Sequence, residues 1–340
     1  MLRILNQPPA PPAPSRPVPR LTNTLTWHDY LGMMCVRLGI GRDRYRVAPG
    51  LYALGAPSPA APVLVTANYK LTVDVVRAAL ADHDAWLLVL DTRGINVWCA
   101  AGKGTFGTDE LVRRIACVGL GSVVTHRELI VPQLAGPGVA AHEVKKRSGW
   151  KVVFGPVRIA DLPAFLTNGR VATPSMRRVR FTLTDRLALA PMELIGGWHV
   201  YLGAALLLPL IAMAQGRLEW TAMLASARVH GSNFIVAVLA GAALTPMLLP
   251  WLPGRAFAMK GFVLGLALVA LNLARLGPVS FGQALASVLL WPAVSAFVAM
   301  NFTGASTYTS LSGVQKEMRY AVPAEIGVAT LGTLVALLTR

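Results

Sequence analysis

The chain has 340 residues, of which 54% are apolar and only 14% are charged, and its mean hydropathy is +0.52. Soluble domains carry roughly 25% charged residues, so this composition excludes an entirely soluble protein and predicts that part of the chain lies in a membrane. The formal net charge is +16. Because this positive charge accompanies so high an apolar content, we expect it to contact an anionic membrane surface rather than nucleic acid.

The first residues predict an extended tail. Seven prolines fall within residues 8–19, and no apolar core of the kind found in a secretory signal precedes them. We therefore expect a flexible tail over residues 1–25 and a first half that stays in the cytosol.

Residues 26–168 are expected to form an α/β domain. Apolar runs alternate with segments of helical spacing, which is typical of a parallel sheet covered on both faces. Ligands of such sheets bind beyond the carboxyl ends of the strands, so the loops after Ala67, Asp91, Thr125 and Phe154 are expected to line one site. The predicted strands are 62–67, 86–91, 122–125 and 151–154, and the predicted helices are 71–81, 108–117, 138–146 and 161–166.

The second half predicts a transmembrane domain over residues 191–340, after a basic linker at 169–190. Five apolar segments are long enough to cross about 30 Å of hydrocarbon: residues 195–214, 233–252, 256–274, 279–302 and 320–339. Ionisable groups such as Lys260 and Glu325 fall near the ends of these segments, which argues against a transport pathway. The basic flank places the soluble domain in the cytosol; it comprises Arg177, Arg178, Arg180 and Arg186.

The three cysteines are Cys35, Cys99 and Cys117. No two of them form a CxxC pair, so cysteines alone cannot build a zinc site or an iron–sulfur cluster, and their odd number argues against a disulfide framework. We interpret Cys35 and Cys117 as core residues of apolar helices. On residues alone, Cys99 is either a buried small side chain or a reactive thiol.

The segment 96–103, Asn-Val-Trp-Cys-Ala-Ala-Gly-Lys, follows a predicted strand where a helix should begin. It is not a P-loop, because the required glycine and Ser/Thr positions are held by Val97 and Gly104. The glycines at 102, 104 and 107 have no acidic partner at the spacing of a dinucleotide fingerprint. His126 and His142 show no catalytic spacing to Cys99, and we interpret both as loop histidines.

Residues 91–108 around Cys99 resemble the corrinoid-binding segment of the membrane-bound corrinoid protein of bacterial mercury methylation. Segments 65–72, 132–142, 154–158 and 301–314 are similar to other segments of that family, and 65–72 also resembles the related corrinoid iron–sulfur protein of the acetyl-CoA pathway. The chain lacks the Asp-x-His-x-x-Gly motif that supplies a cobalt histidine in many methyltransferases, and it lacks a four-cysteine cluster motif.

The resemblance implies an α/β corrinoid-binding domain followed by an all-α transmembrane domain of about five helices. It implies a cobalamin-type corrinoid with the Cys99 thiolate as lower axial cobalt ligand, and methyl transfer to Hg(II) that yields methylmercury. Further implied cofactor contacts are Thr66, Asn68, Tyr69, Asn96, Val97, Trp98, Ala100, Ala101, Gly102, Lys103, Thr105, Thr108, Gln133 and Gly155. Trp98 is equally compatible with a core position, and Lys103 with a solvated one.

The implied partners are a ferredoxin-like electron donor with two [4Fe-4S] clusters and a methyl-donor protein of one-carbon metabolism. The implied location is a bacterial or archaeal cytoplasmic membrane. Two alternatives stay open: a membrane-tethered corrinoid methyl carrier of one-carbon metabolism, and a transporter with a cytosolic regulatory domain. A nucleic-acid binder is disfavoured because the basic stretch 145–186 lacks interleaved aromatic residues.

Overall fold

The computed structural model describes residues 17–199, 201–203, 205–206, 213, 220–302 and 311–338. Contacts divide the chain into two compact units. The first runs to Val179, except that Arg37–Gly39 group with the second, which begins at Arg180. Each unit is described by itself.

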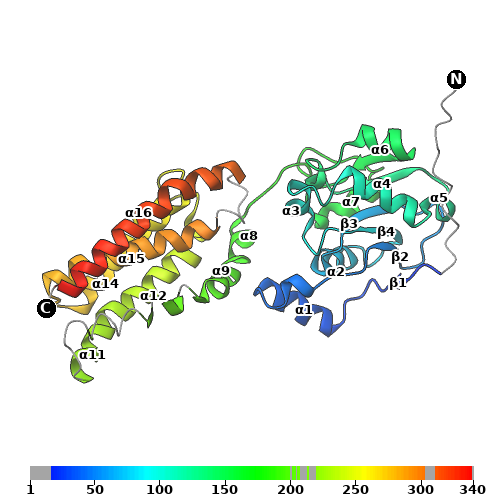
Figure 1. Cartoon of the computed structure of the whole chain (residues 1–340). Helices are drawn as coiled ribbons and strands as arrows, with labels where there is room; N and C mark the ends of the chain where they lie inside the picture. Colours follow the sequence, from blue (N-terminus) through cyan, green and yellow to red (C-terminus); the bar gives the residue numbers. More distant parts are fainter. Residues whose placement is uncertain are drawn as a thin grey trace. The chain divides into compact units, whose positions relative to one another are not determined.

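A six-stranded sheet forms the centre of the first unit (Figure 1). Its order is β1-β2-β4-β3-β5-β6, and β2 runs antiparallel to β4 while the other pairs are parallel. The expectation of a wholly parallel sheet is therefore wrong at β2. The strands are β1 (Arg20–Leu21), β2 (Gly50–Leu54), β3 (Val63–Ala67), β4 (Ala85–Leu90), β5 (Glu128–Val131) and β6 (Lys151–Phe154).

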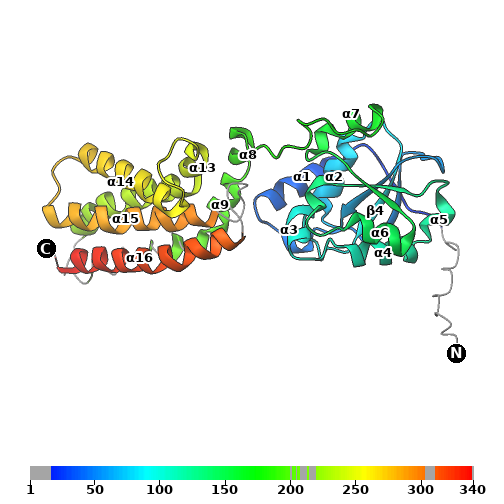
Figure 2. The same ribbon diagram turned by 90° about the horizontal axis from the view of Figure 1, so that it is seen from above.

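Helices cover both faces of this sheet (Figure 2). One face packs against α3 (Val97–Gly102), α4 (Thr108–Cys117) and α6 (Ala141–Ser148), and the other against α2 (Lys70–Ala79) and α7 (Leu162–Thr167). Successive strand residues alternate between the two cores: Leu88 faces the first, and Leu87 and Val89 face the second. All three are fully buried, which explains why β4 is a continuous apolar run.

The predicted strand at 122–125 is wrong. Gly119 adopts a left-handed conformation with φ of 59° and starts the short helix α5 (Leu120–Val123). The chain becomes extended only at Val124, and the strand that pairs with β3 and β6 begins at Glu128. The loop at this edge of the sheet therefore follows Val131 rather than Thr125.

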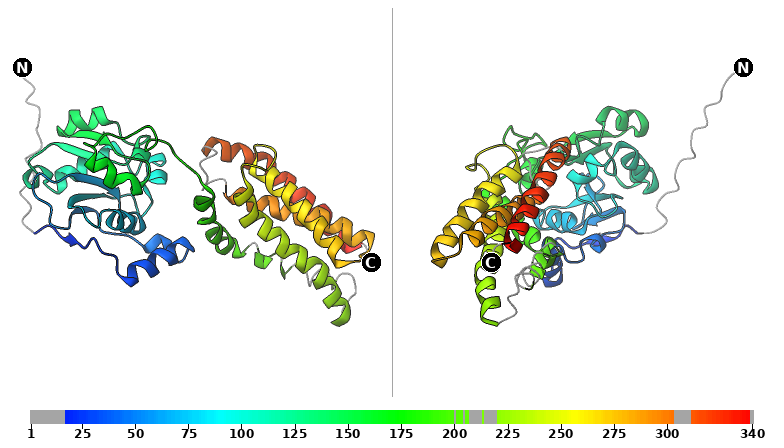
Figure 3. Two further views of the ribbon diagram at one scale, coloured as in Figure 1. Left: turned by 180° about the vertical axis from the view of Figure 1, so that it is seen from behind. Right: turned by 60° about the vertical axis from the view of Figure 1, so that its left-hand side comes forward.

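The second unit is helical, and α14 (Phe257–Leu276), α15 (Phe281–Asn301) and α16 (Leu311–Leu338) pack side by side (Figure 3). Small residues permit close contact: Ser295 donates a hydrogen bond to the carbonyl oxygen of Gly261 at 2.8 Å, and a Cβ on Gly265 would lie 2.6 Å from that of Ser295. The remaining segments are α8 (Leu183–Leu187), α9 (Ala190–Gly196), α11 (Trp220–Ser226), α12 (Ser232–Leu239) and α13 (Thr245–Leu248).

Four helices in the described part of the chain are long and apolar enough to cross a membrane: Leu224–Leu248, Phe257–Leu276, Phe281–Asn301 and Ser312–Leu338. The predicted span 195–214 lies partly outside the described residues, which within it are 195–199, 201–203, 205–206 and 213. The predicted span 233–252 is shifted, because the helix ends at Leu248 and the chain turns over 249–252. The last span begins at Ser312, not at residue 320, and the helix α16 that contains it begins at Leu311. Glu325 therefore lies in the middle of α16 rather than near an end.

Hydrogen bonds hold the chain to the first unit just before the boundary between the units and to the second unit just after it. Arg177 donates a hydrogen bond to the Gln133 side chain at 2.7 Å, and the Val157 amide donates to the Met176 carbonyl oxygen at 2.8 Å. In the second unit, the buried Arg186 guanidinium on α8 donates to the carbonyl oxygens of Pro246 and Met247 at 3.2 and 2.7 Å.

Candidate functional site

Cys99 lies on the outward side of α3, the helix that follows β4. The Asn96 side chain caps this helix and accepts a hydrogen bond from the Cys99 amide at 2.9 Å. Ala100 and Ala101 point into the core and are at most 4% exposed. The outward side consists of Trp98, Cys99, Gly102 and Lys103, all of them exposed. Because a Cβ added at Gly102 would meet nothing within 4 Å, this side is an open platform with one thiol.

The loop before α3 is held by Asn68, at the end of β3. The Asn68 side-chain oxygen accepts hydrogen bonds from the Thr92 amide, the Thr92 hydroxyl and the Gly94 amide at 2.8–3.1 Å. Thr92 also donates to the carbonyl oxygen of Ile95 at 2.6 Å. Asn68 is thus a buried support of the platform, and the structure does not place it among the residues that line the neighbouring pocket.

A pocket of about 280 Å³ lies beside α3, at the carboxyl ends of the strands. Trp98 lines this pocket and also belongs to the platform. The Thr66 hydroxyl on β3 is buried and has no hydrogen-bond partner in the described structure. Five residues of this lining are predicted cofactor contacts: Thr66, Asn96, Val97, Trp98 and Gly155. Leu134, Pro156 and Val157 also line the pocket; they lie in the resembling segments 132–142 and 154–158 but are not predicted as contacts. Ile159 and Leu162 are not predicted either, although their place after β6 was an available signal.

The other predicted contacts have structural partners of their own. Tyr69 is buried at the N-terminus of α2, where its ring lies under Arg42. Thr105 donates to the carbonyl oxygen of Ala100 at 3.3 Å, and Thr108 accepts from the Ala140 amide at 2.9 Å. Gln133 accepts from Arg177, as described above. These residues shape the loops around the platform and lie outside the lining of the 280 Å³ pocket.

The three cysteines differ in their exposure to solvent. Cys99 and Cys117 are exposed and Cys35 is half-buried, so the expectation of a core position is wrong for Cys117. His126 is a satisfied loop histidine as expected, since its Nε2 lies 2.9 Å from the Ala61 carbonyl oxygen and its Nδ1 accepts from the Glu128 amide. Among the described residues no three His, Cys, Asp or Glu side chains gather as a metal site.

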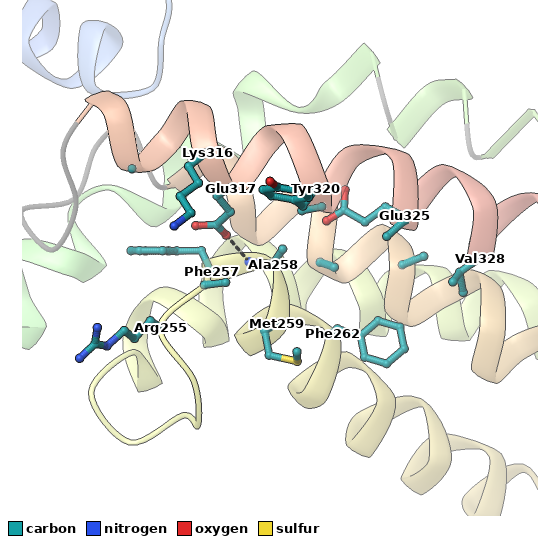
Figure 4. A pocket seen from close by; sticks show the side chains of 16 residues that line it. Arg255, Phe257, Ala258, Met259, Phe262, Lys316, Glu317, Tyr320, Glu325 and Val328 are labelled. Carbon is teal, nitrogen blue, oxygen red and sulfur yellow. Dashed lines mark hydrogen bonds between the residues drawn. The ribbon is translucent and has the colours of Figure 1, made fainter.

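A second and larger pocket, of about 870 Å³, lies in the helical unit between α14, α15 and α16 (Figure 4). Its lining is mostly apolar, with Arg255 and Lys316 toward one end and Glu325 further along α16. Glu317 accepts a hydrogen bond from the Ala258 amide at the start of α14, at 2.7 Å. Glu325 is 9% exposed, and neither carboxyl oxygen has a hydrogen-bond partner within the part of the chain that the structure describes.

Comparison with known proteins concerns the first unit. Residues 23–166 match the family model of the CO dehydrogenase/acetyl-CoA synthase delta subunit. This stretch contains α3, the whole platform and the 280 Å³ pocket. The helical unit lies outside it.

Curated relatives match the same region. The gamma subunit of the acetyl-CoA decarbonylase/synthase complex from Methanopyrus kandleri is 37% identical over 127 residues, which are 37% of this chain and 27% of the relative. The gamma subunit from Archaeoglobus fulgidus is 35% identical over 127 residues, with the same shares. The one from Methanothermobacter thermautotrophicus is 31% identical over 151 residues, 43% of this chain and 32% of the relative. The chain thus spans about a third or less of the length of these relatives.

Proposed function

We propose that this protein is a membrane-anchored corrinoid protein that carries a methyl group, with the Cys99 thiolate as cobalt ligand. The observation that carries the proposal is the single exposed thiol on an open platform beside a mostly apolar pocket, at the carboxyl ends of the strands. The likeness of residues 23–166 to subunits of acetyl-CoA decarbonylase/synthase supports a role in one-carbon metabolism. It also supports protein partners from such a complex.

The residues present fit a corrinoid on physical grounds. A flat macrocycle needs a surface without side chains that stand up from it, and Gly102 beside Cys99 leaves such a surface open. The tail of the cofactor ends in a flat heterocyclic base, for which the 280 Å³ pocket offers apolar walls. The Thr66 hydroxyl, buried without a partner, would there gain the hydrogen bond that it lacks.

Each residue of the platform has a definable task. A corrinoid, when bound, supplies a cobalt ion that can take up and pass on a methyl group. Cys99 would offer the soft anionic sulfur that suits such a metal, and Asn96 would fix the position of that sulfur through its bond to the Cys99 amide. Buried Ala100 and Ala101 hold α3 against the sheet, and exposed Lys103 could pair with the phosphate of the cofactor tail.

A second candidate concerns the methyl acceptor. The anionic sulfur of Cys99 would donate electron density to the cobalt of a bound corrinoid, which would favour giving up a methyl group to an electrophile such as Hg(II). The sequence resemblance around Cys99 favours this acceptor. The relatives, which are subunits of the acetyl-CoA decarbonylase/synthase complex, favour instead a partner in acetyl-CoA metabolism. In either case we propose a cytoplasmic membrane location, with the α/β unit in the cytosol and a two-cluster ferredoxin as electron donor.

Replacing Cys99 tests both parts of the proposal. The full chain, purified without oxygen and supplied with cobalamin, should retain cobalt and show a visible absorption spectrum. We expect Cys99→Ala to shift that spectrum and to abolish methyl transfer, because the sulfur donor is gone. Cys117→Ala is the matched control, since it also removes an exposed free thiol.

The outcomes separate the candidates. A wild-type chain that binds no cobalt contradicts the corrinoid proposal, and an unchanged spectrum in Cys99→Ala contradicts the ligand role. Methylmercury formation in the presence of a two-cluster ferredoxin would decide for Hg(II). Its absence, in protein that loads cobalamin and accepts a methyl group, would decide for a methyl carrier.

A further inference from the structure

Helix α1 (Trp27–Arg37) has apolar residues on both its sides. The side fastened to the domain holds Asp29 together with the buried Met33 and Val36. The Asp29 carboxylate accepts a hydrogen bond from Lys70 at 2.6 Å and lies 3.5 Å from the Arg77 guanidinium. Both cations belong to α2, where they also pair with the fully buried Asp74 at 2.7 and 2.8 Å.

The other side of α1 is apolar and faces outward. Trp27, Tyr30, Leu31 and Met34 are 64%, 60%, 44% and 59% exposed. Their spacing of three, four and seven residues puts them on one stripe of the helix. Scattered exposed apolar residues are ordinary, but a contiguous stripe that contains two aromatic rings indicates a binding surface.

The chemistry around the stripe points to an anionic lipid surface. Trp and Tyr are the side chains enriched where a bilayer meets water. Residues 27–46 contain four arginines and two aspartates, and one of the aspartates, Asp29, is already held in ion pairs. Arg37 and Arg44 are exposed and have no carboxylate partner among the residues described, so they are available to headgroups.

The short link between the units favours contact of α1 with the lipid surface. The chain stays bonded to the first unit as far as Arg177, and Thr182 begins the capping box of α8 in the second. Only residues 178–181 lie between, and the five steps from Arg177 to Thr182 span at most about 18 Å. A domain tethered this closely to membrane-spanning helices meets the lipid at a high effective concentration, so even weak interfacial binding suffices.

We propose that α1 lies in the headgroup region of the cytosolic leaflet, with its apolar stripe in the lipid and Arg37 and Arg44 against anionic headgroups. This is a second contact of the protein with the bilayer, independent of the helices that cross it. It also orients the domain, because α1 is bonded to α2, and α2 directly follows the Asn68 loop that supports the platform.

The test uses the full chain in lipid nanodiscs. A Met34→Cys variant, with the three native cysteines replaced by serine, is labelled with bimane, and nitroxide lipids report contact with the membrane. The label should lose most of its fluorescence in discs of phosphatidylglycerol and much less in discs of phosphatidylcholine. A label at Lys146→Cys, on the exposed side of α6, is the matched control and should stay bright in both.

Charge reversal tests whether Arg37 and Arg44 bind anionic headgroups. Arg37→Glu with Arg44→Glu should abolish the difference between the two lipids. Equal brightness at positions 34 and 146 in anionic discs overturns the proposal. So does a Met34→Cys label that is shielded only as protein concentration rises, since a second copy would then cover the stripe. Quenching that is insensitive to the charge reversal overturns the role of the two arginines.

Discussion

Three polar side chains near the platform differ in whether their oxygen atoms take part in hydrogen bonds. The side-chain oxygens of Asn68 and Asn96 accept hydrogen bonds from backbone amides, and both residues thereby fix the conformation of the loop and of α3. The hydroxyl of Thr66 is as deeply buried as Asn68 but has no partner within the described residues. At this scale, the residue without a partner is the one that indicates a ligand.

Replacing this hydroxyl by a methyl group should separate ligand binding from stability. Because Thr66→Val removes a buried polar atom that makes no hydrogen bond, we expect no loss of thermal stability, and retention of cobalamin should fall by about tenfold for a lost bond of about 1.4 kcal/mol. The measurements are thermal unfolding and cobalt content after gel filtration.

Thr92→Val is the matched control. The Thr92 hydroxyl is equally buried but bonds to Asn68 and Ile95, so its loss should cost about 1–3 kcal/mol of stability. If Thr66→Val destabilises the chain as much as Thr92→Val does, the unpaired hydroxyl has a structural partner after all.

At the scale of elements, α1 buries Met33 and Val36 and is joined to α2 by the ion pairs of Asp29 with Lys70 and Arg77. Burial alone would raise the pKa of Asp29, but hydrogen bonds from Lys70 and from the Thr26 amide and hydroxyl outweigh it and hold that pKa well below its usual range. Burial would likewise lower the pKa of Lys70, whereas its bonds to Asp29, Asp74 and Tyr45 raise it. Helix attachment is therefore dependent on pH.

The sign of this dependence follows from the depressed pKa. Ionised Asp29 stabilises the fold above the ordinary carboxyl pKa of 3.8, and this contribution is lost as pH falls below that value toward the folded pKa. We expect the protection of residues 27–37 against hydrogen exchange, measured relative to the intrinsic rate at each pH, to fall below about pH 4 before the sheet opens. In Asp29→Asn this protection should already be low at pH 7 and should vary little with acid. Equal acid sensitivity in the wild type and this variant would rule out Asp29 as the titrating group.

Helix α16 poses a different problem, because it carries Glu325 at mid-length against an apolar pocket. A buried polar group without a partner costs roughly 1–3 kcal/mol. We expect Glu325→Leu to raise the unfolding temperature in detergent, because it removes this cost. We also expect it to abolish methyl transfer in cells, because a carboxyl group that lowers stability is retained in an apolar helix where it acts. Glu317→Gln is the comparison, since Glu317 is engaged at the start of α14.

On the scale of the whole molecule, the platform and its pocket lie within the first unit. Replacing residues 183–340 by an unrelated membrane anchor should therefore leave the cobalt content per chain unchanged. A loss of cobalt in well-folded fusion protein would show that the helical unit takes part in cofactor binding. Methyl transfer measured on the same fusion would report what the helices add beyond anchoring.

Features that depend on neighbouring residues could be predicted from the sequence, whereas features that depend on residues distant in the chain could not. Strand β6 and helix α4 were predicted with the bounds observed, because apolar runs and an acidic first turn are local signals. The antiparallel β2 and the roles of Asn68 were not, since the partners of Asn68 lie 24–26 residues away in the chain. The prediction for Glu325 was wrong because the apolar segment begins at residue 320, whereas helix α16 begins earlier, at Leu311.

The link between the units has two fastenings of unequal strength. Arg177 holds Gln133 through one exposed hydrogen bond, whereas Arg186 is buried and holds two carbonyl oxygens while its guanidinium lies over the Trp251 ring. Under a pulling load the first fastening should yield before the second. The length gained would come entirely from the first unit, and it would release the Gln133 loop beside the pocket while Arg186 kept its bonds to the helical unit.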